Sequence, residues 1–213
     1  IMDHHVGWLH TVAERSTHEE RPAWRVRAEF VMRLLRSGTP IELHRVRVVH
    51  FGVATPFEPY AFTMTSNESG DERRVEGRVD DGVMHMTTRI DGRSRTHEVA
   101  LPDGTLFEEA VGYYVHERLG DTGSTRDATV FNGDMLQPMG DTFQVRGLEP
   151  LALPDGSEVE ATVVDHVFDW MDGVRMTEWY DPAGRLLATE MDALGVPMRV
   201  TLTTRENATM MGD

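Results

Sequence analysis

The chain has 213 residues, with 21 basic and 36 acidic side chains and a formal net charge of −15. This charge excludes a nucleic-acid-binding protein that depends on bulk electrostatics, because such proteins need excess cations to displace counterions from phosphates. Every basic residue is Arg and there is no Cys, which excludes Schiff-base chemistry, a P-loop lysine, disulfides, thiolate metal sites and cysteine nucleophiles.

The composition is that of an ordinary globular protein, because 39% of the residues are hydrophobic and 27% are charged. No window approaches the roughly 18 consecutive apolar residues that a membrane-spanning helix needs, so we predict no transmembrane segment. Residues 1–5 lack the cationic and then apolar pattern of a signal peptide. We therefore expect that any targeting segment is missing from this chain.

Alternating apolar and polar residues predict strands in the first half of the chain. In the clearest case, charged residues separate the apolar positions Trp24, Val26, Ala28, Phe30, Met32 and Leu34. A similar run over 6–12 precedes it, and the polar residues 16–21 predict the turn of an antiparallel hairpin. Two more strands are predicted over 41–51 and 57–65; in the second, Tyr60, Phe62 and Met64 share one parity.

Asp-Gly pairs then recur between alternating segments, for example at Asp81-Gly82 and Asp91-Gly92. Such pairs favour tight hairpin turns because both residues tolerate positive φ. The turn at 91–92 pairs residue 90 with residue 93. This register places His85 opposite Glu98, and it turns His97 to the other face. The strands predicted from these signals are 73–79, 83–90, 93–101, 158–170, 174–180, 185–191 and 198–204.

One segment breaks the alternation and predicts an amphipathic helix over about 105–119. Its apolar positions lie three or four residues apart: Phe107, Ala110, Val111, Tyr114 and Val115. We predict a single mainly β (α+β) domain over 1–213. In it, about ten strands form a large curved antiparallel sheet or half-barrel, which holds the helix on its concave face.

Motifs for catalysis are weak. Asp121-Thr122-Gly123-Ser124 matches the carboxylate motif of aspartic proteases, but it follows a polar helix end and has no second copy. The sequence lacks Gly-x-Ser-x-Gly and Gly-x-Gly-x-x-Gly, so a serine hydrolase elbow and a dinucleotide fingerprint are both missing. We predict a loop at 121–124, no catalytic residues and no cofactor. The chain is thus predicted not to be an enzyme.

Ten His residues raise the possibility of a metal site. The spacing of His4 and His5, of His44 and His50, and of His85 and His97 does not bring their rings together on regular strands. We therefore predict no metal ligands, and a metal-binding protein using His and acidic residues stays a third alternative.

Methionine is the more informative residue, with 13 in the chain. Flexible thioethers suit a surface that must adapt to an ill-shaped apolar ligand, although they also fill gaps in cores. We predict a groove lined by aromatic and methionine side chains that alternate along the strands: Trp24, Phe30, Met32, Tyr60, Phe62, Met64, Met84 and Met86. Arg45 and Arg47 interrupt the apolar parity of the neighbouring strand.

Several stretches resemble an uncharacterised bacterial envelope-protein family whose fold is akin to the half-barrel of lipoprotein carriers of the LolA/LolB type. They are the opening Gly7-Trp8-Leu9-His10, the strand 24–36, Leu101-Pro102 before the helix, and the ending from Trp179-Tyr180-Asp181-Pro182 through Leu194-Gly195-Val196 to Arg205-Glu206. Domains of this kind often stand beside transglutaminase-like domains. The resemblance implies export to the periplasm or cell envelope, and it implies no catalytic residues.

The leading hypothesis is a non-enzymatic envelope domain that binds a lipid, an acyl chain or a partner segment in the curved-sheet groove. The alternative is a structural or protein-interaction module with a closed core, which docks an envelope protein and is accessory to a transglutaminase-like enzyme.

Overall fold

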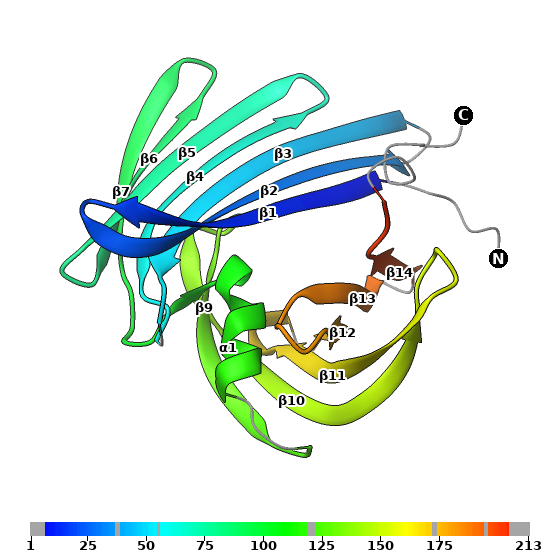
Figure 1. The fold of residues 1–213 in the computed structure, drawn as a ribbon. Coiled ribbons are helices and arrows are strands. Elements are labelled where there is room, and N and C mark those ends of the chain that lie inside the picture. The colour runs from blue at the N-terminus through cyan, green and yellow to red at the C-terminus, as the bar shows by residue number, and fades with distance from the viewer. Residues whose placement is uncertain are drawn as a thin grey trace. The chain divides into compact units, whose positions relative to one another are not determined.

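The computed structural model describes residues 7–36, 39–54, 56–118, 122–171, 174–193 and 196–204. Within these residues the chain is mainly β with one α-helix, which confirms the predicted fold class. The strands form two seven-stranded sheets rather than the single large sheet that we expected (Figure 1). The chain divides into two compact units, each built around one sheet. The single-domain organisation over 1–213 stays a prediction.

The N-terminal unit holds the first sheet, in which the order of the strands is their order in the chain. All neighbours are antiparallel, because each strand returns through a short turn to pair with the previous one. The strands are β1 (Gly7–His18), β2 (Arg21–Arg36), β3 (Thr39–Gly52), β4 (Pro59–Glu68), β5 (Asp71–Asp80), β6 (Val83–Ile90) and β7 (Arg93–Ala100).

Turn chemistry determines the register of this sheet. Asp91 and Gly92 have φ angles of 50° and 74°, as a type I′ hairpin turn requires. Residue 90 pairs with residue 93, and His85 lies opposite Glu98 with 3.2 Å between Nδ1 and Oε1. This confirms the register predicted from the Asp-Gly pair.

The first hairpin is longer than predicted. Its turn lies at Glu19 and Glu20, where both residues have positive φ, so β1 continues to His18 through residues that we expected in the turn. The tip of this longer hairpin contacts β5 of the same sheet, because Glu19 forms an ion pair with Arg78 at 3.2 Å.

The C-terminal unit holds the second sheet, with the strand order β14-β13-β12-β11-β10-β9-β8. Only the pairing of β8 with β9 is parallel among the described strands. The strands are β8 (Leu106–Phe107), β9 (Thr125–Asn132), β10 (Gln137–Ala152), β11 (Glu158–Phe168), β12 (Val174–Tyr180), β13 (Leu186–Ala193) and β14 (Val196–Thr201).

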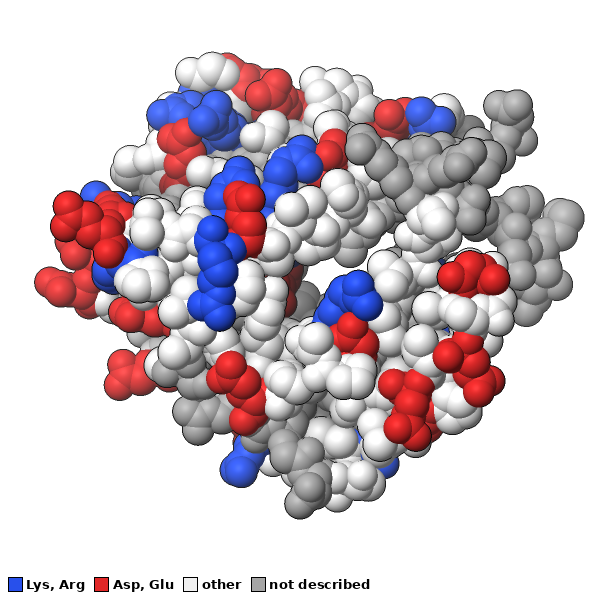
Figure 2. All heavy atoms as spheres, viewed as in Figure 1, with Lys and Arg blue, Asp and Glu red and all other residues white. Residues whose placement is uncertain are grey.

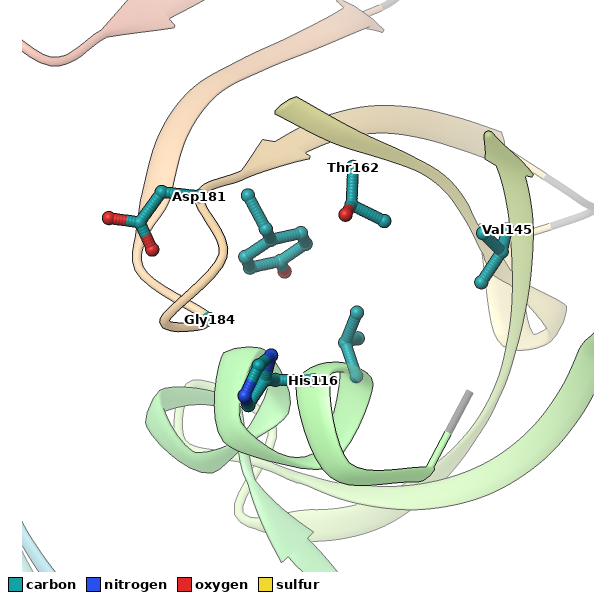
Figure 3. A pocket seen from close by; sticks show the side chains of 7 residues that line it. His116, Val145, Thr162, Asp181 and Gly184 are labelled. Atoms are coloured by element: carbon teal, nitrogen blue, oxygen red, sulfur yellow. The ribbon is translucent and has the colours of Figure 1, made fainter. Parts of the chain in front are cut away.

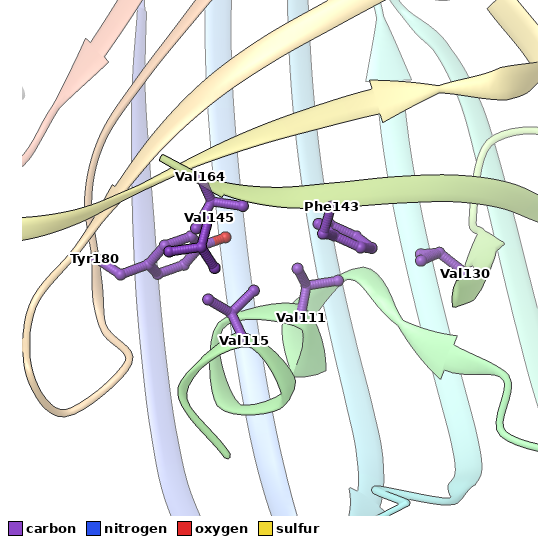
Figure 4. Close-up of a cluster of buried hydrophobic side chains, with 7 residues drawn as sticks. All are labelled: Val111, Val115, Val130, Phe143, Val145, Val164 and Tyr180. Carbon is purple, nitrogen blue, oxygen red and sulfur yellow. The ribbon is translucent and has the colours of Figure 1, made fainter. Parts of the chain in front are cut away.

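The predicted helix is present, but it is shorter than 105–119. Strand β8 and a 3₁₀ turn over Glu108–Ala110 come first, and α1 spans Val111–Arg118. Two of its side chains, Val111 and Val115, pack into the core of the unit (Figure 4). The sheet contributes Val130, Phe143, Val145, Val164 and Tyr180 to this core.

Two glycines allow α1 to approach the turn between β12 and β13. A Cβ added to Gly112 would lie 2.5 Å from the carbonyl oxygen of Gly184, and one added to Gly184 would lie 2.8 Å from that of Gly112. Gly184 also has a φ of +77°, a conformation that other residues rarely adopt. Backbone therefore packs directly on backbone at this point.

Some predictions concern residues outside the described ranges. These are the strand start at Val6, the ligand candidates His4 and His5, the carboxylate of Asp121, the turn pair Asp172-Gly173, and the resemblance at residues 194–195 and 205–206.

Candidate functional site

Seven of the eight predicted groove residues lie on one face of the N-terminal sheet. Ladder neighbours share a face, and Phe62 pairs with Val49 on one side and Gly77 on the other. We call this side of the sheet the Phe62 face. By the same register it carries Trp24, Phe30, Met32, Met64, Met84 and Met86.

Tyr60 is the exception, because a β-bulge between His50 and Phe51 interrupts the alternation. Its ring stacks on that of His18, with 6.0 Å between centroids, and the guanidinium of Arg21 lies 3.9 Å from the ring centroid. His18 and His50 belong to the face opposite Phe62 and stack on each other at 5.0 Å. The prediction that Tyr60 lies on the same face as Phe62 and Met64 is therefore wrong.

Solvent exposure divides the Phe62 face into two parts. Phe62, Met64, Met84 and Met86 are at most 2% exposed, so they are core residues in this structure. Trp24 is half-buried, and the guanidinium of Arg15 lies 4.2 Å from its ring centroid.

A second row of residues, which pair with one another across all seven strands, is more exposed to solvent than these core residues. Leu9 and Ile90 are 43% and 45% exposed, and Phe30 between them is half-buried. We call this the open row, and its members from β1 to β7 are Leu9, Phe30, Arg45, Ser66, Arg73, Ile90 and Arg93. On the next row, Met32 and Leu43 pair and are also half-buried.

The charges on the Phe62 face are unusual for so acidic a chain. Among the described side chains its only acids are Glu68 and Asp71, which pair with each other beside the β4–β5 turn. Among the same described side chains, the basic residues on this face are Arg15, Arg45, Arg47, Arg73, Arg93 and Arg95. The prediction that Arg45 and Arg47 interrupt an apolar face is thus confirmed.

The opposite face of the same sheet neutralises its charges locally. Arg25 pairs with Glu14 at 2.7 Å and Arg33 with Glu42 at 3.0 Å. Glu76 contacts Arg74 on its own strand, β5, and Arg89 on the neighbouring strand, β6. On the side of the molecule that Figure 2 shows, basic and acidic side chains lie next to one another. The two faces of the sheet therefore differ in both polarity and charge balance.

A second site, which sequence patterns did not predict, lies buried in the C-terminal unit. His166 of β11 lies between two carboxylates, with Nε2 3.0 Å from Oδ2 of Asp141 and Nδ1 3.5 Å from Oε2 of Glu178. The three side chains are 7% exposed or less. Its ring also lies against Phe143 and Phe168, with centroids 4.3 and 4.2 Å away.

Electrostatics favour a charged His166. Burial alone would lower its pKa, but the contacts with Asp141 and Glu178 outweigh that effect and raise the pKa to about 9. Neither ring N–H points directly at its oxygen, so these contacts are ion pairs rather than well-directed hydrogen bonds. Burial, together with the nearby charge of Glu178, also raises the pKa of Tyr180. The Tyr180 hydroxyl therefore stays protonated.

This cluster is suited to holding the C-terminal core together rather than to binding a metal. The two nitrogens of one imidazole point in opposite directions, so the carboxylates on either side cannot converge with the ring on one ion. No group of three or more potential ligands in the described residues has a geometry that could hold a metal ion.

A small pocket lies where α1 meets the β12–β13 turn (Figure 3). It has a volume of about 80 Å³, far below the roughly 300 Å³ of typical ligand sites. Asp181, at its rim, already accepts hydrogen bonds from the backbone of Ala183 and Arg185 and from the Arg185 side chain. The remaining lining residues are Val115, His116, Val145, Thr162, Tyr180 and Gly184.

The residues of the protease-like motif and the histidine pairs considered as metal ligands form no common site among the described residues. Thr122 to Ser124 precede β9, where the backbone of Gly123 and Ser124 bonds to Val145 of β10, as the predicted loop requires. His44 contacts Glu29 at 2.9 Å, while His50 stacks on His18. His85 and His97 lie on opposite faces of their hairpin, as predicted.

Comparison with known proteins shows a relationship in fold. No protein-family model and no curated protein matches the chain. A β-barrel-like protein of domain of unknown function DUF1849 from Brucella abortus is similar, with a TM-score of 0.56 and 14% identity over 89% of this chain and 83% of that chain. A DUF1089 family protein from Pseudomonas aeruginosa gives 0.42 and 13% over 83% of this chain and 87% of that chain.

The first of these similarities is a likeness of fold over most of the chain, and it agrees with a mainly β architecture with one helix. In the part of the chain that the structure describes, no helix is both long and apolar enough to cross a membrane.

Proposed function

We propose that this chain is a non-enzymatic cell-envelope domain that binds the acyl chain of a lipid on the open row of the Phe62 face. The observation that carries the proposal is the position of the partly exposed apolar side chains Leu9, Phe30 and Ile90 on one row of this sheet face. The half-buried Met32 and Leu43 extend this apolar surface.

The burial pattern supports the open row as the binding surface. Phe62, Met64, Met84 and Met86 are already covered, so they serve as the rigid floor of the face. Covering the exposed parts of Leu9, Phe30 and Ile90 with a ligand would stabilise the complex by about 25 cal/mol for each Å² of apolar surface removed from water. An acyl chain matches such a surface because it needs no polar partners.

Two further features fit a non-enzymatic domain of the cell envelope. The most strongly perturbed ionisable cluster, around His166, lies within a core and has carboxylates on both ring nitrogens, which suits a structural function. The resemblance to an envelope family akin to LolA/LolB carriers supports a location in the periplasm or envelope.

The second candidate is a structural or protein-interaction module, accessory to a transglutaminase-like enzyme. It is favoured by the near-complete burial of four predicted groove residues, which is typical of a closed core. In this case the half-exposed side chains of the open row would contact another protein instead of a lipid.

The deciding experiment measures binding of monopalmitoylglycerol, an uncharged C16 amphiphile, by native mass spectrometry and by displacement of a fluorescent fatty acyl probe. Leu9→Glu is the test variant and Val12→Glu is the matched control. These residues are 43% and 41% exposed on the same strand but on opposite faces. We expect Leu9→Glu to weaken binding at least tenfold and Val12→Glu to leave it unchanged. No binding to the unmodified chain, or equal losses in both variants, would overturn the proposal.

A further inference from the structure

We infer that the ligand of the Phe62 face is an amphiphile with an anionic headgroup, which lies across the strands with its acyl chain toward β1 and its headgroup toward β7. This inference rests on the proposed function, because it names the class of lipid that the same surface selects. It follows from an asymmetry along the open row that acyl binding alone does not require.

Apolar side chains occupy the β1–β2 end of the open row, next to Arg45 of β3, and the β2–β3 positions of the neighbouring row. Leu9 pairs with Phe30, and Met32 pairs with Leu43. All four are exposed or half-buried, and none of the positions between them on this face carries an acid. This end therefore offers a surface for hydrocarbon.

Arginines occupy the β5–β7 end. Arg73 of β5 pairs with Ile90 of β6, which pairs with Arg93 of β7. Arg95 lies on the same face two residues along β7, opposite Thr88. Arg93 and Arg95 are exposed and form no ion pair with the described residues. Arg guanidinium groups are well suited to carboxylate and phosphate oxygens because they present several N–H donors in one plane.

The distance between the two ends suits one lipid molecule. Neighbouring strands are about 4.8 Å apart, so β2 is separated across the sheet by roughly 14 Å from Arg73 on β5 and by roughly 24 Å from Arg93 and Arg95 on β7. A lipid whose headgroup lies at these arginines can extend its acyl chain across β6 and β5 toward Phe30. Charge complementarity thus selects an anionic lipid over a neutral one, and the polarity of the row gives the bound lipid a direction.

The opposite face shows that the arginine surplus is not a general property of this sheet. There, Arg74 and Arg89 both contact Glu76, at 2.7 and 2.9 Å. These two arginines lie on β5 and β6 as ladder neighbours. They therefore provide a matched pair of cations on the opposite face, where we propose no lipid binding.

The test compares palmitate and lysophosphatidylglycerol with monopalmitoylglycerol, using chains of equal length, in the intact protein. We expect both anionic lipids to bind about tenfold more tightly than the neutral one, and this preference to shrink as salt is raised. The double variant Arg93→Gln/Arg95→Gln should lose the preference while it keeps its affinity for monopalmitoylglycerol. The control Arg74→Gln/Arg89→Gln removes the same charge and should keep the preference.

Equal affinity for anionic and neutral lipids would overturn the inference while leaving the proposed acyl binding intact. A preference that survives in Arg93→Gln/Arg95→Gln would also overturn it. If neither class of lipid binds, the proposed function itself fails. Binding to phosphatidylglycerol vesicles without uptake of lipid monomers would show a membrane-surface contact, and it would overturn the inference as well.

Discussion

The two seven-stranded sheets treat their charged side chains in different ways. The described charged side chains of the N-terminal sheet are exposed or half-buried, paired with opposite charges on one face and mainly cationic on the other. The C-terminal sheet buries a histidine and two carboxylates beneath a layer of aromatic rings. A surface charge costs little to keep and is available to a ligand, whereas a buried charge must be matched within the core. The comparison therefore agrees with the binding role that we propose for the first sheet and with a structural role for the charges buried in the second.

The largest effect should come from removing the buried cation. In His166→Gln, Asp141 and Glu178 would lose their positive partner while both remain buried. We expect a loss of about 3–5 kcal/mol in the free energy of unfolding, measured by urea denaturation with circular dichroism. The triple variant Asp141→Asn/His166→Gln/Glu178→Gln carries no charge in this cluster and should recover part of the loss. A His166→Gln protein as stable as the unmodified chain would show that the cluster does not hold the core.

The pH dependence of stability should have opposite signs in the two sheets. The pKa of His166 is raised to about 9 from 6.5, so its stabilising contribution is complete below pH 6.5 and is lost as the pH rises through 9. For a shift of this size the loss is about 3 kcal/mol. Burial, together with the charges of His18 and Arg25, lowers the pKa of His50. Its contribution is therefore present above pH 6.5 and is lost as the pH falls.

Urea unfolding from pH 5 to 10 would measure both effects. His166→Gln should flatten the alkaline side of the stability profile, and His50→Gln should flatten the acidic side. The assignment would be contradicted if the variants exchanged these effects or if neither changed the profile.

A smaller effect is expected where α1 meets the β12–β13 turn. In Gly184→Ala a Cβ would lie 2.8 Å from the carbonyl oxygen of Gly112, in addition to the strain of a φ of +77°. The control Gly82→Ala in the N-terminal sheet has a similar φ of +72° and nothing within 4 Å of the added Cβ. We expect Gly184→Ala to be about 1–3 kcal/mol less stable than Gly82→Ala. Similar thermal midpoints for the two variants would show that the close approach is not needed.

The smallest effect should come from the paired face of the N-terminal sheet. A hydrogen bond from Arg89, and to a lesser extent the charge of Arg74, lowers the pKa of Glu76, but these groups are exposed. Exposed ion pairs contribute at most about 1 kcal/mol, so Glu76→Gln should change the free energy of unfolding by less than that, and salt should remove the difference. A loss comparable with that of His166→Gln would contradict the comparison between the sheets.

Much of the N-terminal sheet could be predicted from the sequence, because its register depends on local turns. The Asp91-Gly92 pair was enough to place His85 opposite Glu98. Alternation alone could not predict the bulge beside His50, and so Tyr60 was assigned to the wrong face. Burial also depends on tertiary packing, which is why alternation did not distinguish the open row from the covered methionines.

The buried cluster escaped prediction for the same reason. A two-residue turn at 172–173 would pair His166 with residue 179 and turn Glu178 to the opposite face. In the structure the loop between Phe168 and Val174 contains a 3₁₀ turn over Asp169–Met171. His166 therefore pairs with Met176, and Glu178 lies on the His166 face. The longer loop changes the register between β11 and β12, which the alternation of residues does not predict, and this register brings Glu178 to His166.

The strand order of the N-terminal sheet has a consequence for how the chain folds during synthesis. Each strand from β2 to β7 pairs with the one that precedes it in the chain. A hairpin forms in about 1–10 µs, whereas a ribosome takes about a second to add ten residues. The strand that each new strand pairs with has therefore already been synthesised when the new strand emerges. The first sheet can grow by one strand at a time, with its exposed edge covered as soon as the next hairpin leaves the ribosome.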